Sequence, residues 1–171
     1  MKHPRSTFLP SRRDTQGPSA PEESGRAEGG IERFGQAWLQ RFPEYGNRLV
    51  VAVGGTVDYQ VRMALRDRLH THTGMGQGDA VLDLTRVEFL DAYGTGAVIA
   101  LHNRLCDQRR RLYIAAAPTG PVLRILCITG LTTILRLRDD LPGALIAAGI
   151  GPAAEVSPLR SAFARLTGRA T

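Results

Sequence analysis

Lysine is almost missing from this chain of 171 residues, because Lys2 is the only lysine among its 22 basic side chains. A phosphate-binding Walker loop requires a lysine after its glycines, so this class of nucleotide site is excluded. Serine is also missing between Ser24 and Ser157. A nucleophile elbow places a serine or cysteine at a strand-to-helix turn, and no turn in the middle of the chain has one.

Cysteine and histidine are scarce, which argues against a metal centre. Cys106 and Cys127 both fall within apolar helical patterns, and we expect both to be buried, reduced and structural. His70 and His72 are two residues apart on a predicted helix, so they point in different directions. His102 stands alone on another helix, and we expect a structural role for it.

Long apolar runs are absent too. The longest, "LPGALIAAGIGPAA", is interrupted by proline and glycine and is too short to span a bilayer. The first residues are charged but have no apolar stretch of the secretory type. The sequence therefore predicts a cytoplasmic protein with no membrane partner.

The net charge of +6 is spread thinly along the chain. Its only cluster is Arg109–Arg111, where a helix is expected to end and cations complement the helix dipole. Nucleic-acid binding requires a clustered basic surface, so we expect no nucleic-acid partner.

Composition divides the chain into three parts. Residues 1–34 are rich in Pro, Ser, Gly, Arg and Glu, and are predicted to be a disordered tail. Residues 35–148 form the predicted domain. Residues 149–171 form an extension with a short amphipathic helix at 158–167, which has apolar residues at helical spacing.

Strand and helix patterns alternate within the domain, which predicts an α/β fold. We expect a mixed, mostly parallel sheet of about five strands, with an antiparallel edge strand from an opening hairpin, and about four helices. The expected strands are 36–42, 48–58, 80–85, 111–117 and 133–138. The expected helices are 58–73, with Asp58 as its N-cap, 95–109, 119–130 and 140–149.

The stretch "FLDAYGTG", Phe89 to Gly96, is an unusual corner between a strand and a helix. Gly94 and Gly96 could begin a dinucleotide fingerprint, but Ile99 occupies the position of its third glycine. Asp58, Asp83 and Asp91 could gather at one end of the sheet around Mg²⁺, although helix capping and loop hydrogen bonds explain them more simply. We expect no catalytic residue, no metal and no cofactor.

Three segments resemble a STAS domain of the anti-sigma factor antagonist type: "LVVAVGGTVDYQVRMALRDRL", "AVLDLTRVEFLDAYGTGAVIALHNRL" and "RLYIAAAPTGPVLRILCITGL". The most specific part is Val81 to Leu101. It is similar to the family pattern of an apolar strand, D-L-s, a linker, F-L-D-S-s-G-L and an apolar helix. "GGTVD" is similar to the family's G-E-L-D turn.

The resemblance implies binding without catalysis. Bacterial members bind an anti-sigma factor of the histidine-kinase-like ATPase type, which releases a sigma factor. That partner is also a serine kinase, and it reverses the binding by phosphorylating the serine of the D-S pair. The resemblance implies that this chain contacts its partner through these residues: Asp58, Asp91, Ala92, Tyr93, Gly94 and Thr95.

The chain departs from the family pattern at the switch. Asp91 matches the family aspartate, but Ala92 occupies the position of the serine, and alanine has no oxygen to accept a phosphate. We therefore expect no phosphorylation of the domain. Tyr93 is either an interface anchor or a buried loop residue. Two other functions stay open: a STAS module that senses a small ligand or nucleotide, and a scaffold or transport-system STAS subunit.

Overall fold

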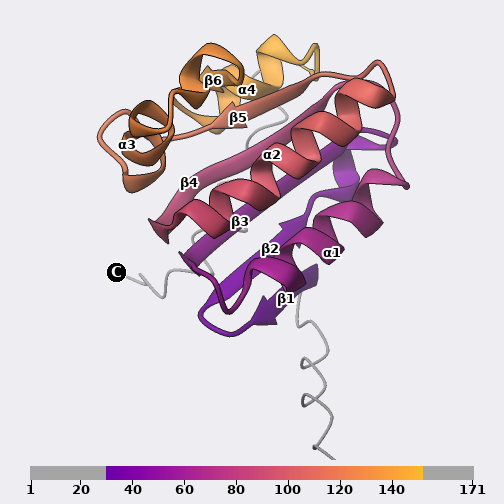
Figure 1. Ribbon diagram of the computed structural model, residues 1–171. Helices are drawn as coiled ribbons and strands as arrows, with labels where there is room; N and C mark the ends of the chain where they lie inside the picture. The colour runs from indigo at the N-terminus through magenta and orange to yellow at the C-terminus, as the bar shows by residue number, and fades with distance from the viewer. Residues whose placement is uncertain (1–29, 152–171) are drawn as a thin grey trace, which may run out of the picture.

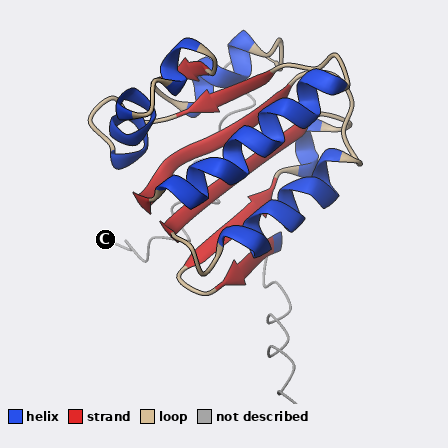
Figure 2. Ribbon diagram, in the orientation of Figure 1, coloured by secondary structure: helices blue, strands red, loops and turns tan. Residues whose placement is uncertain are grey.

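The computed structural model describes residues 30–151, which form a six-stranded sheet with helices on both faces (Figures 1 and 2). The strands are β1 (Ile31–Phe34), β2 (Ala37–Arg41), β3 (Leu49–Val57), β4 (Ala80–Leu90), β5 (Leu112–Ala115) and β6 (Arg136–Arg138). The helices are α1 (Arg62–Thr73), α2 (Ala92–Asp107), α3 (Pro121–Ile128) and α4 (Leu141–Ala147), with 3₁₀ turns η2 (Pro43–Tyr45) and η3 (Leu131–Thr133).

The strands lie in the sheet in their order along the chain. β1, β2 and β3 are antiparallel neighbours, whereas β3, β4, β5 and β6 are parallel. Each parallel pair is joined by a crossover that contains a helix, as parallel strands require. The α/β class, the mixed sheet with an antiparallel start and the four helices of the sequence prediction are thereby confirmed.

Two apolar layers hold the sheet between its helices. Buried residues of α1, α2 and α3 pack with one face of the sheet, and Leu82 and Leu84 of β4 belong to this larger core. Val81 lies in a second cluster on the other face, with α4 and the aromatic residues Phe42 and Tyr45. This alternation along β4 is expected for a strand that is covered on both sides. Figure 1 shows α1 and α2 side by side in front of the sheet.

The ladder between β3 and β4 has register shifts, one between Ala52 and Gly54 and one between Gly55 and Thr56. Gly55 has φ of +80°, and a Cβ there would lie 2.2 Å from the carbonyl oxygen of Gln36. Only glycine fits this position. The irregularity lets both strands continue to a common end, where Val57 pairs with Leu90.

Four predictions about element boundaries and burial are corrected. Residues 31–34 belong to β1 and not to a disordered tail, and they add a sixth strand to the predicted five. β4 runs to Leu90, well past the predicted end, because β3 also continues and pairs with it. α2 begins at Ala92 rather than Thr95.

The fourth correction concerns the cysteines, both of which are exposed. Cys106 directly follows the buried Leu105 of α2, and Cys127 directly follows the buried Leu126 of α3. One residue is a rotation of about 100° around a helix, so each thiol is turned away from the core.

No helix within residues 30–151 is long and apolar enough to cross a membrane. The predicted amphipathic helix at 158–167 and the predicted tail before residue 30 lie outside the described residues.

Candidate partner-binding surface

The corner identified in the sequence lies where two parallel strands end together. β3 ends at Val57 and β4 at Leu90, and these residues are paired in the ladder. Asp58 and Asp91 follow them, so both aspartates lie at the carboxyl edge of the sheet. This is the edge at which open α/β sheets place their binding residues.

Asp91 fixes the start of α2. It is the N-cap, and its side-chain oxygen accepts a hydrogen bond from the Gly94 amide at 2.7 Å. Its own amide donates to the carbonyl of Val57 at 3.2 Å, which ties the corner to the end of β3. Capping of α2 is therefore a sufficient structural reason for an aspartate at position 91.

Asp58 does not cap α1 as predicted. α1 begins at Arg62, and the carboxylate of Asp58 accepts from the amides of Gln60 at 2.9 Å and Val61 at 3.3 Å. It therefore stabilises the turn that precedes the helix. Aspartate hydrogen-bonds its own backbone two residues on in such turns. The turn places Tyr59 at the tip of the corner.

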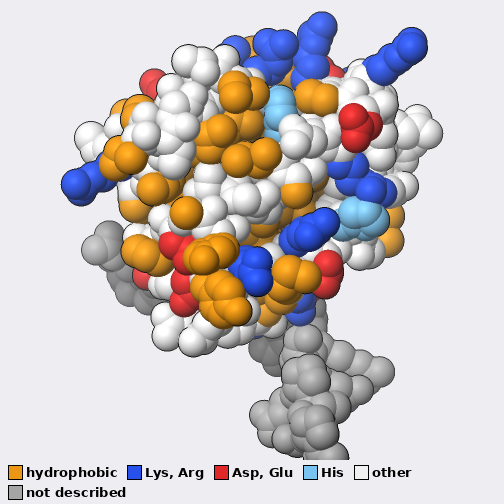
Figure 3. Space-filling model, in the orientation of Figure 1, with side chains coloured by type: hydrophobic (Ala, Val, Ile, Leu, Met, Phe, Trp, Pro, Cys, Tyr) orange, Lys and Arg blue, Asp and Glu red, His pale blue; other side chains and the backbone are white. Residues whose placement is uncertain are grey.

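An exposed aromatic cluster covers the corner. The rings of Tyr59 and Tyr93 meet edge to face with centroids 5.3 Å apart, and they are 58% and 56% exposed. The guanidinium carbon of Arg62 lies 4.7 Å from the first centroid and 5.3 Å from the second. We call Tyr59, Arg62, Met63, Ala92 and Tyr93 the tyrosine surface. Figure 3 shows hydrophobic side chains around a basic one in the lower part of this face.

The structure separates the six predicted contact residues into two groups. Asp58, Asp91, Ala92 and Tyr93 lie at the surface or partly exposed. Gly94 and Thr95 are buried, so the prediction that they lie on the surface is corrected. The Thr95 hydroxyl donates to the Asp91 carbonyl at 2.8 Å and faces inward because it lies on the core side of the first helical turn.

Three residues of the tyrosine surface were missed in the sequence: Tyr59, Arg62 and Met63. Tyr59 carried a usable signal, because it is an aromatic residue directly after the predicted end of a strand at the carboxyl edge. Arg62 and Met63 follow it on the first turn of α1. Their proximity to Tyr93 depends on how α1 and α2 pack, which spacing along the chain does not reveal.

The histidines of α1 and Asp83, which were considered as possible metal ligands, have partners within the protein. His72 lies 3.0 Å from a carboxylate oxygen of Glu32, and His70 is hydrogen-bonded to Arg104. Asp83 is buried and accepts from the amide and hydroxyl of Thr85. Burial raises its pKa. Within residues 30–151, no group of three histidine, cysteine or acidic side chains could hold a metal ion.

Comparison with known proteins identifies related folds. A family model described as "MlaB, STAS domain" matches residues 41–138. An anti-sigma factor antagonist from Mycobacterium paratuberculosis is similar, with TM-score 0.57 and 24% identity over 64% of this chain and 93% of that chain. The anti-sigma factor antagonist SpoIIAA in its unphosphorylated form is similar with TM-score 0.50 and 16% identity, over 78% of this chain and 99% of that chain. No curated protein matches the sequence.

Proposed function

Because this chain belongs to the STAS domain family, we propose that it is an anti-sigma factor antagonist that acts by binding. Its partner is an anti-sigma factor of the histidine-kinase-like ATPase type, and occupation of that partner releases a sigma factor. The chain performs no catalysis in this role. It acts in the cytoplasm, where transcription takes place.

One observation carries the proposal: an exposed cluster, the tyrosine surface, lies at the corner where the sequence resemblance led us to expect the partner contact. Two half-exposed tyrosines and an arginine there are held together by ring and cation–π contacts. Tyrosine and arginine are among the residues that most often dominate binding energy at protein interfaces. Because the cluster is already ordered by these contacts, little side-chain freedom is lost on binding.

The same surface lacks the family's phosphorylation switch. Ala92 is exposed at the first position of α2, and it is the sequence resemblance that assigns the family's serine to this position. A phosphate there would add about −1.5 to −2 charges beside Asp91 and Tyr93 and oppose a hydrophobic contact. Without an acceptor oxygen at this position, ATP does not reverse the binding.

The proposal is tested by titrating the chain into the anti-sigma factor encoded by the same genome and measuring heat release. Tyr93→Arg removes an exposed ring and places a cation beside Arg62. We expect affinity to fall about 30-fold, which corresponds to the loss of about 2 kcal/mol for an interface anchor. The melting temperature should change little, because Tyr93 is 56% exposed.

Ile134→Arg is the matched control, since Ile134 is 59% exposed and precedes β6, away from the corner. It should bind as the wild type does. If Tyr93→Arg binds as tightly as this control, the tyrosine surface is not the interface.

A further inference from the structure

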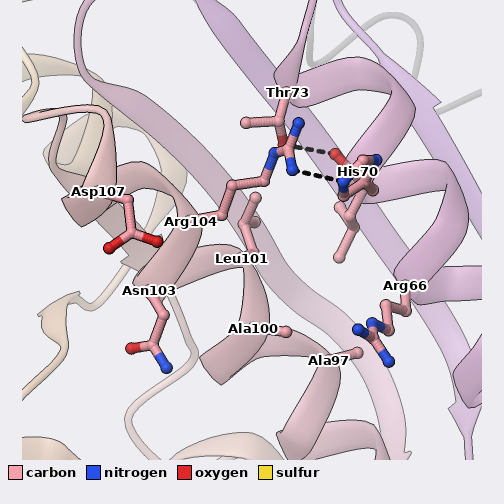
Figure 4. Close-up of a pocket in the computed structure, with 10 residues that line it drawn as sticks. Arg66, His70, Thr73, Ala97, Ala100, Leu101, Asn103, Arg104 and Asp107 are labelled. Carbon is pink, nitrogen blue, oxygen red and sulfur yellow. Dashed lines mark hydrogen bonds between the residues drawn. The ribbon is translucent and has the colours of Figure 1, made fainter.

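A groove between α1 and α2 extends upward from the tyrosine surface. Its lower part has a volume of about 260 Å³ and is bordered by Arg62, Met63 and Tyr93. Its upper part has a volume of about 270 Å³ and reaches Asp107 at the end of α2. Arg66, Ala97 and Ala100 border both parts, so the two form one continuous groove. Figure 4 shows its upper part.

The walls of this α1–α2 groove are basic. Arg62, Arg66 and Arg104 line it, against a single carboxylate, that of Asp107. Arg104 of α2 reaches across to His70 of α1, as Figure 4 shows. The groove therefore offers donors and positive charge to a ligand that brings carboxylates.

The floor of the groove is apolar. Gly96, Ala97 and Ala100 of α2 present nothing larger than a methyl group, and Leu69 and Leu101 border the upper part. Small residues let another backbone approach closely. α2 spans 16 residues, or about 24 Å, which matches a helix of about four turns. An amphipathic helix presents apolar residues along one face and charges at both margins, as this groove requires.

We propose that the α1–α2 groove binds an acidic amphipathic helix of the anti-sigma partner, as a continuation of the contact made at the tyrosine surface. This inference rests on the proposed function for the identity of the partner. The tyrosine surface supplies the anchor at one end, and the arginines supply charge complementarity along the groove. Positive charge of this kind increases association rates and selects against basic partners.

The chain itself offers a competing occupant. Residues 14–29 contain Asp14, Glu22, Glu23 and Glu28 with one basic residue, Arg26. They precede β1, whose Glu32 pairs with Arg68 on α1 at 3.0 Å. This segment has no large apolar side chain for the floor of the groove, so the partner helix fits better. The segment's occupation of the groove is a distinct outcome of the test.

The first experiment probes the groove without the partner. The full chain, labelled with ¹⁵N, is titrated with a four-turn synthetic helix that has leucines on one face and glutamates on the other. We expect amide shifts at Ala97 and Ala100, and at least tenfold weaker binding by Arg66→Glu/Arg104→Glu. The same peptide with lysines in place of glutamates should not bind. Equal binding of both peptides, or shifts elsewhere only, overturns the proposal.

The second experiment uses the anti-sigma factor. Arg66→Glu/Arg104→Glu should weaken its binding at least tenfold and reduce its dependence on salt, while Arg124→Glu/Arg136→Glu, on exposed positions of α3 and β6, should not. If the groove variant binds as the wild type does, the groove proposal fails and the proposed function stands. If the wild type does not bind at all, the proposed function fails and the partner assignment fails with it.

Two further outcomes would contradict the proposal and show that something other than the partner helix occupies the groove. In the full chain, Glu22→Gln/Glu23→Gln/Glu28→Gln removes three of the four acidic side chains of residues 14–29 and leaves that segment, with Asp14 and Arg26, without net charge. A tighter binding of the acidic peptide by this variant shows that the tail occupies the groove. Light scattering that finds a wild-type dimer and a monomeric Arg66→Glu/Arg104→Glu variant shows that a second copy does.

Discussion

At the scale of single residues, the carboxylate of Asp91 accepts a hydrogen bond from the Gly94 amide and so fixes the start of α2, beside which Tyr93 is exposed. The place of Asp91 at this corner was expected from the sequence. Thr95 was expected on the surface and is 3% exposed. Whether Tyr93 was buried was left open, and it is exposed. A shift of one residue turns a side chain by about 100° on a helix, so burial depends on packing that local patterns do not define.

Asp83 is a buried carboxyl group whose effect on stability can be measured as a function of pH. It is 2% exposed, and burial raises its pKa above 3.8, although hydrogen bonds from Thr85 and the charge of Arg86 oppose the rise. The folded protein therefore binds this proton more tightly than the unfolded chain does. Its contribution to stability is favourable below 3.8 and is lost as the pH rises through the elevated folded-state pKa.

Asp83→Asn keeps an acceptor oxygen for Thr85 and removes the charge. We expect the variant to melt at a higher temperature than the wild type at pH 7, and the difference to shrink as the pH is lowered toward 3.8. Thermal melts by circular dichroism across this range measure it. A lower melting temperature for the variant at pH 7 would mean that attraction to Arg86 outweighs the cost of burial.

At the scale of elements, the order and type of strands and helices were predictable, whereas their ends were not. The alternation of apolar strands with amphipathic helices was sufficient to define the parallel part of the sheet. β1 was missed because its four residues, "IERF", include two charges and directly follow a stretch rich in glycine and glutamate. Its strand conformation depends on pairing with β2, which is a tertiary contact.

Two glycines at the start of α2 have different surroundings, so we expect their substitution by alanine to have opposite effects on stability. At Gly94, a Cβ would lie 2.7 Å from side-chain atoms of Leu90 and Val57 and 2.8 Å from the Val57 carbonyl oxygen. Gly94→Ala should lower the free energy of unfolding by about 1–3 kcal/mol, as overpacking does. At Gly96 a Cβ meets nothing within 4 Å, and Gly96→Ala should raise it by up to about 1 kcal/mol.

Urea denaturation of both variants measures these free energies, and each serves as the control for the other. Equal tolerance of alanine at the two positions would contradict the close approach of the α2 entry to the end of β3.

At the scale of the whole molecule, the domain is a sheet whose carboxyl edge presents the exposed tyrosine surface, which we propose as the contact surface. The family was predictable because its pattern is concentrated in one continuous stretch from Val81 to Leu101. The tyrosine surface was only half predictable, since Tyr59 and Tyr93 are far apart in sequence and meet because β3 and β4 end side by side. The α1–α2 groove was not predicted at all, because it exists only between two packed helices.

The most direct test of the account is displacement of sigma factor from its complex with the anti-sigma factor, followed by fluorescence polarisation of labelled sigma factor. The wild-type chain should release the sigma factor equally well with and without ATP, and Tyr93→Arg should not release it. Ala92→Ser restores an acceptor hydroxyl, so its activity should be lost when ATP is present. Sigma factor that stays bound in the presence of excess wild-type chain, or release by the wild type that ATP abolishes, would contradict the account.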